Sequence, residues 1–199
     1  MKYGIAAALL AVAASAPAPA ATAWDERPGA QGDLSDDRLS PTPVLMALGH
    51  NIVTGTTGDA GHGVDRDYFR FSVPTGTVLS SLMVMPTTSV SGSSSFIALQ
   101  AGPQITVTPT GGGNLGDLYG LMHYENQHVG TDILPLLVGS AAKWPVPSGT
   151  YSVWVQETGG EVAYSLDFVI TAVPEPASAL SLGLGLFGLA CRRFVLQRR

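Results

Sequence analysis

TYSVWVQETGGEVAYSLDFVIT, the stretch at residues 150–171, contains two runs in which every second residue is apolar. That alternation is typical of a β-strand with one buried face. The apolar positions are Tyr151, Val153 and Val155 in the first run and Tyr164, Leu166, Phe168 and Ile170 in the second. Two such runs separated by a Gly-Gly pair, here Gly159 and Gly160, predict an antiparallel β-hairpin.

Shorter strand patterns precede this pair. They cover residues 67–73, 78–85, 95–101, 104–108, 118–124 and 133–138, and Gly- or Pro-containing turns separate several of them. Helical periodicity is rare along the chain. The sequence therefore predicts an all-β fold, an antiparallel β-sandwich of jelly-roll-like form, for an ectodomain at residues 44–172.

The N-terminus has the pattern of a cleaved secretory signal peptide at residues 1–23. A short positive region precedes an almost wholly apolar run, and Ala21-Thr22-Ala23 then supplies the small residues that signal peptidase requires. Cleavage is expected before Trp24, with a site ending at Ala20 as the alternative. Residues 24–43 form a polar lead-in, which we expect to be mobile or to form a loosely attached first strand.

The C-terminal residues 173–199 combine three features in order. Val173-Pro174-Glu175-Pro176 comes first, and its prolines favour an extended backbone that a protease can reach. An uncharged apolar run at residues 177–190 follows; as a helix it would measure about 21 Å, against a bilayer core of about 30 Å. A basic end would then hold that side of the segment in the cytoplasm. Its arginines are Arg192, Arg193, Arg198 and Arg199.

This order of features resembles the PEP-CTERM sorting signal of Gram-negative bacteria. The resemblance implies processing by exosortase, a membrane protease-transpeptidase. The segment at residues 177–190 would first serve as a transient transmembrane helix in the inner membrane, and the protein would then reach the cell surface or the extracellular space. The alternative is a permanent single-span anchor, which an intact C-terminus on the mature protein would reveal.

A second resemblance concerns the ectodomain. DRDYFRFSVPTG at residues 65–76, and PSGTYSVWVQE at residues 147–157 followed by YSLDF, resemble strands of the bacterial pre-peptidase C-terminal domain. That resemblance implies a small jelly-roll-like β-sandwich that lends stability or binds surfaces, and some members bind calcium. The middle of the chain, residues 90–143, does not match the family pattern.

The composition excludes several kinds of function. Residues 24–173 carry fourteen acidic and five basic side chains, a formal charge of −9. An acidic domain without a basic patch argues against nucleic-acid binding and is compatible with divalent cations. Cys191 is the only cysteine and lies in the tail. The ectodomain therefore has no internal disulfide, no cysteine nucleophile and no cysteine zinc site.

Asp59, Asp65 and Asp67 are the candidate metal ligands. They lie in or just after a Gly-rich loop at residues 55–63, where carboxylates and backbone carbonyls can together supply the oxygen ligands that calcium needs. The alternative is that these side chains cap turns. Calcium is the one cofactor that the sequence offers, and we expect no other.

Trp144 and Trp154 are the candidate sugar-stacking residues. Trp154 lies on the face of its strand opposite Val153 and Val155, so it would be partly exposed if the valine face is the core. The alternatives are a central strand that is buried on both faces, or a loop that Trp154 covers. Exposure of either tryptophan in a groove would favour sugar binding.

We expect a protein without catalytic activity. The chain has no Gly-x-Ser-x-Gly elbow, and no carboxylates are paired by their spacing. The expected role is structural or adhesive, in exopolysaccharide or biofilm, with exosortase and signal peptidase as processing partners. A carbohydrate-binding module is the alternative. A hydrolase is the third reading and would require a buried carboxylate pair or a Ser–His contact in a pocket.

Overall fold

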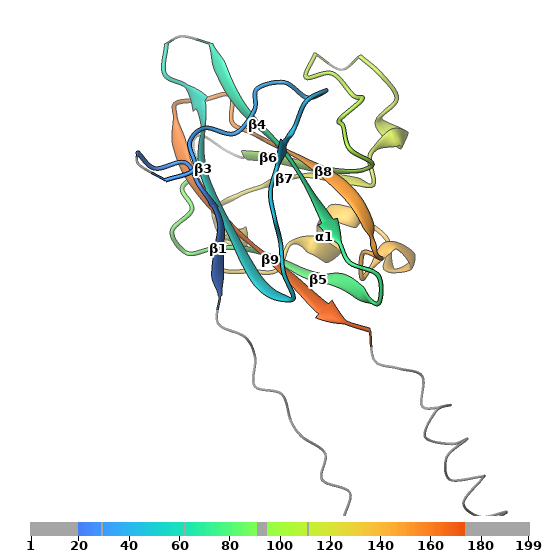
Figure 1. The fold of residues 1–199 in the computed structure, drawn as a ribbon. Helices are drawn as coiled ribbons and strands as arrows, with labels where there is room; N and C mark the ends of the chain where they lie inside the picture. The colour runs from blue at the N-terminus through green and yellow to red at the C-terminus, as the bar shows by residue number, and fades with distance from the viewer. Residues whose placement is uncertain (1–19, 29, 62, 91–94, 111, 174–199) are drawn as a thin grey trace, which may run out of the picture.

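The computed structural model describes residues 20–173 except residues 29, 62, 91–94 and 111 (Figure 1). Within these residues the chain forms nine β-strands, one α-helix and three short 3-10 turns. The strands are β1 (Ala21–Asp25), β2 (Thr42–Pro43), β3 (Gly49–Asp59), β4 (Val64–Val73), β5 (Thr77–Val84), β6 (Ser95–Ala101), β7 (Gly120–Tyr124), β8 (Gly149–Gln156) and β9 (Val162–Ala172). The helix is α1 (Leu134–Val138).

The strands form one curled sheet with two facing halves (Figure 1). The first half has the order β5-β9-β3, with β1 added to β3; the second has the order β4-β8-β6-β7, with β2 added to β4. The halves are joined where β3 turns into β4, at the pairs Gly58–Asp65 and Asp59–Val64. Pairing is antiparallel except for β1 with β3 and β2 with β4. The predicted antiparallel all-β class is confirmed, and the jelly-roll description stays a prediction.

The main core lies between the two halves. Phe168 of β9 is fully buried and contacts rings of the opposite half, with centroid distances of 5.8 Å to Phe69 and 5.3 Å to Phe71. Val153 and Leu166, on alternating positions of the two runs quoted above, are also buried in this core. The sequence alternation therefore identifies the core faces of β8 and β9 correctly.

A second apolar cluster covers the outer face of β4, β6 and β8. Ile105 and Val107 pack there against Tyr68 and Trp154. They belong to the loop between β6 and β7, so the predicted strand at residues 104–108 is wrong. Hydrogen bonds from side chains, rather than strand pairing, fix the position of this loop. Arg38 Nη1 donates to the carbonyl of Ile105, and the Gln100 side chain forms hydrogen bonds with Thr106.

The predicted hairpin across Gly159-Gly160 is also wrong. β8 pairs with β4 and β6, whereas β9 pairs with β3 and β5, so the two strands lie in opposite halves. Each already has two neighbours, and each buries residues on both faces over its central part. The Gly-Gly segment is instead a crossover that runs beside the end of β3, where Asp59 N–H donates to the Gly159 carbonyl at 2.8 Å.

The predicted strand at residues 133–138 is a helix, α1. Pro135 lies in its first turn and Gly139 follows its end with φ of 64°, the proline-first and glycine-last order that favours helices. The longest unpredicted strand is β3. Its second half contains Gly55 and Gly58, and the predicted Gly-rich loop at residues 55–63 is therefore strand up to Asp59.

Candidate functional site

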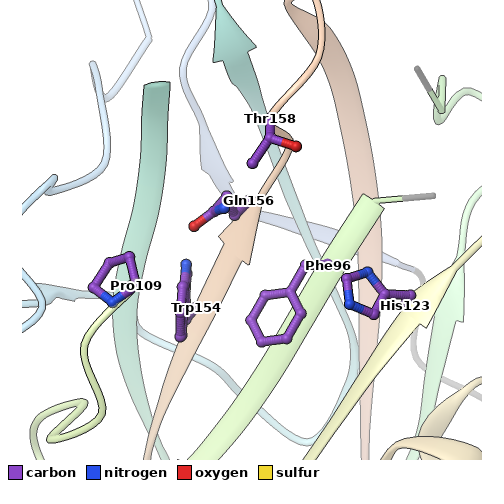
Figure 2. Close-up of a pocket in the computed structure, with 6 residues that line it drawn as sticks. All are labelled: Phe96, Pro109, His123, Trp154, Gln156 and Thr158. Atoms are coloured by element: carbon purple, nitrogen blue, oxygen red, sulfur yellow. The ribbon is translucent and has the colours of Figure 1, made fainter. Parts of the chain in front are cut away.

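An aromatic pocket of about 240 Å³ lies on the outer face of the second half (Figure 2). Phe96 of β6, His123 of β7 and Trp154 of β8 bring their rings together there, with Phe96 centred 4.6 Å from Trp154 and 5.4 Å from His123. Figure 2 shows Pro109 beyond Trp154 and Gln156 above it. The volume lies below the roughly 300 Å³ of typical ligand pockets, so the pocket suits a single ring.

The two tryptophans named from the sequence do not share this pocket. Trp154 lines it but is only 6% exposed, because it also packs into the second apolar cluster. Its indole nitrogen has no hydrogen-bond partner in the part of the chain that the structure describes. Trp144 is 44% exposed and lies outside the pocket lining, with its Nε1 donating to the Ser80 carbonyl. The pocket therefore offers a ligand the half-buried ring of Phe96 and the exposed ring of His123, neither of which the sequence indicated for sugar stacking.

Three carboxylates meet near the end of β1 and the first half of β4, and we call them the acidic cluster: Glu26, Asp33 and Asp67. Each has an oxygen within 4.8 Å of an oxygen of the other two. Glu26 is fixed by the backbone, because its two oxygens accept hydrogen bonds from Leu34 N at 2.8 Å and Thr56 N at 2.7 Å. Asp33 is exposed, whereas Asp67 is completely buried.

Burial and mutual repulsion dominate the electrostatics of the acidic cluster. Burial, followed by the charge of Glu26, raises the pKa of Asp67 to about 9. Burial likewise raises the pKa of Glu26 to about 7 and, with the charge of Asp33 second, that of Asp65 to about 6. Neither oxygen of Asp67 has a hydrogen-bond partner among the described residues. The cluster therefore takes up protons or another positive charge.

The candidate calcium ligands separate in the structure. Asp59 is exposed and caps the turn between β3 and β4, because its Oδ1 accepts from Gly61 N at 2.7 Å. Asp65 is half-buried, and Asp67 lies with Glu26 and Asp33. One sequence signal points to Asp67: it occupies the same face of β4 as the buried Phe69. No comparable signal marks the two residues of the lead-in.

The two ends of the described chain lie at the same end of the domain (Figure 1). Ala21 and Ala23, named for signal peptidase, belong to β1, and Ala23 packs against the core. At the other end β9 ends at Ala172. Val173 is 49% exposed, and its N–H donates a hydrogen bond to the Gly76 carbonyl. Residues 1–19 and 174–199, which include Pro174 to Pro176 and the arginines, lie outside the described residues.

Comparison with known families finds one match. The PEP-CTERM protein-sorting motif matches residues 172–193 and confirms the predicted sorting signal, which indicates an exported protein processed by exosortase at the membrane. Neither the curated proteins nor the solved structures contain a match. The likeness to the pre-peptidase C-terminal domain thus stays a prediction. No helix among the described residues is long and apolar enough to span a bilayer; the run at residues 177–190 lies outside them.

Proposed function

We propose that this is a non-catalytic protein of the cell surface or extracellular matrix, with a structural or adhesive role in exopolysaccharide or biofilm. The observation that carries the proposal is the position of the sorting motif, which begins at residue 172 where β9 ends. β9, which lies between β3 and β5, is the last strand of the described chain. The whole sheet is therefore formed by residue 172, where the motif begins. Removal of the tail would leave the folded domain intact.

The orientation of the two ends supports this proposal. β1 begins opposite Asn51, and the last residues of β9 lie next to Gly49. Both termini of the domain therefore leave at the N-terminal end of β3. A signal peptide and a sorting tail would thus both face the membrane. Cleavage before Trp24 would remove three of the five residues of β1, whereas cleavage after Ala20 preserves them. We therefore expect the mature chain to begin at Ala21.

The proposal of a non-catalytic role rests on the burial of the acidic cluster. A glycosidase uses two carboxylates that reach the same scissile bond of a polymer in an open cleft. Asp67 is completely buried, so a polymer cannot reach it. Only Asp67 of the acidic cluster is fully buried, and the geometry suits a proton or a small ion rather than a sugar chain.

Intact-mass spectrometry of the protein from the cell surface and medium tests the sorting proposal. We expect a chain that begins at Ala21 and ends close to Pro174-Glu175-Pro176. In cells without exosortase the full C-terminus should persist in the membrane fraction. A matched control is the double variant Pro174→Ala and Pro176→Ala, which should also keep the tail. A full-length C-terminus in cells that contain the enzyme would instead establish a permanent anchor.

Sugar binding in the aromatic pocket is the second candidate function. The half-buried ring of Phe96 and the exposed ring of His123, close to Trp154, favour it. We expect Phe96→Ala to weaken retention on the exopolysaccharide of the producing cells about fivefold, since stacking contributes about 1 kcal/mol. Trp144→Ala, outside the pocket, is the matched control. Equal retention of both variants and the unmodified protein on an affinity gel would remove this candidate.

A further inference from the structure

The acidic cluster has a feature that mutual repulsion alone does not explain, namely a second polar group aimed into it. The Tyr164 hydroxyl is buried and lies beside the Asp67 carboxylate, but it makes no hydrogen bond of ordinary geometry with any described residue. Gly55 makes room for this arrangement. A Cβ at Gly55 would lie 2.6 Å from Glu26 Oε2 and 2.7 Å from Tyr164 Oη, so these two oxygens converge on one point.

Oxygen atoms from separate segments thus surround a small space. Buried polar atoms in proteins are nearly always paired, and an unpaired buried carboxylate is costly. Among the described residues the Tyr164 hydroxyl is the polar group close to the Asp67 carboxylate, and neither Asp67 oxygen makes a hydrogen bond of ordinary geometry. The nearby arginines are engaged elsewhere: Arg66 donates to Gln156 and to the Val64 carbonyl, and Arg27 pairs with Asp25. No described side chain supplies the positive charge that the acidic cluster needs.

We propose that the acidic cluster binds one calcium ion, which holds the N-terminal lead-in against the sheet. Two carboxylates of a shared ion lie at most about 5 Å apart when each binds at 2.3–2.6 Å, and the three carboxylates of the cluster meet that condition. The ligands are all oxygen, which selects a hard cation over zinc or copper. Of the three ligands that the sequence indicated, only Asp67 belongs to this cluster, and Asp59 and Asp65 do not.

The surroundings provide a route for the ion. A cavity of about 460 Å³ opens beside the cluster, and Glu26, Gly55 and Tyr164 line it. Asp33 is exposed on the lead-in. The ion would therefore enter from solvent and bridge two parts of the chain: the lead-in, through Glu26 and Asp33, and β4, through Asp67. Since Leu34 of the lead-in is buried in the main core, the ion would stabilise that packing as well.

Titration of the EDTA-treated full-length chain with CaCl2, in mild detergent, tests the proposal. Isothermal calorimetry should show one site with a dissociation constant of order 10⁻⁴ to 10⁻³ M, the range of extracellular calcium modules. At about 100 times that constant the melting temperature should rise by about 5–10 °C. Asp67→Asn and Asp33→Asn should each abolish the heat and the shift, whereas Asp59→Asn should keep both.

Two results would overturn the proposal. One is the absence of heat and of a melting shift in the unmodified chain, which would leave the cluster as carboxyls that share protons. The other is binding that persists in both Asp33→Asn and Asp67→Asn, because the ion would then lie elsewhere. Asp33 is exposed, so its variant keeps the test valid even if Asp67→Asn does not fold. The outcome does not depend on the sorting of the protein.

Discussion

Replacing Gly58 with alanine is expected to destabilise the domain by about 2–4 kcal/mol. Gly58 has φ of 129°, a conformation that L side chains rarely adopt. A Cβ there would lie 2.7 Å from the Gly160 carbonyl oxygen and 2.7 Å from Glu161 Cα, both backbone atoms that cannot rotate away. Strain and overpacking therefore act together. Urea unfolding followed by circular dichroism measures the loss.

Gly160→Ala is the matched control for this experiment. Gly160 does not have positive φ, and a Cβ there would meet no atom within 4 Å, so we expect a change below about 0.5 kcal/mol. The predicted hairpin implies the opposite ranking, because its two-residue turn would need glycine at that position. A larger loss for Gly160→Ala than for Gly58→Ala would therefore contradict the crossover between the two halves.

The ranking of these glycines shows where local sequence patterns stop being informative. Alternation at Tyr151 to Val155 and at Tyr164 to Ile170 identifies two strands and their core faces. It says nothing of which strands pair, because pairing depends on partners distant in the chain. β9 pairs with β3 over nine positions, from Gly49–Ile170 to Thr57–Val162. Because β3 contains glycines, its sequence resembles a loop, and the strand that pairs with β9 was not recognised.

The candidate site was predictable in the same uneven way. Asp67 could be noticed, since an acidic residue on the apolar face of an alternating strand conflicts with the pattern. Glu26 and Asp33 could not, because they lie in a polar segment where carboxylates are ordinary, and the parallel pairing of β1 with β3 brings them to Asp67. For Trp154 the sequence left exposure and burial open. Ile105, Val107 and Leu118 of the segment between β6 and β7 cover its face, and no local pattern indicates that contact.

Raising the pH from 5 to 8 is expected to destabilise the full-length chain when EDTA keeps calcium away. The folded state holds the pKa of Asp67 at about 9, above the ordinary value of 3.8 that the carboxyl has in an unfolded chain. The folded state therefore binds more protons between these values, and its stability is complete below about pH 4 and falls as pH rises toward 9. From Asp67 alone the slope approaches about 1.4 kcal/mol per pH unit. Glu26 and Asp65 shift in the same direction.

Asp67→Asn separates this mechanism from a general effect of net charge. The amide cannot ionise, so the variant should lose most of the slope. It should also be more stable than the unmodified chain at pH 8, because its folding no longer requires the uptake of a proton by Asp67. Asp59→Asn changes the net charge equally but lies on the exposed turn, and it should retain the slope. Urea midpoints at pH 5 and pH 8 decide the matter. An unchanged slope in Asp67→Asn would mean that Asp67 does not carry the pH dependence.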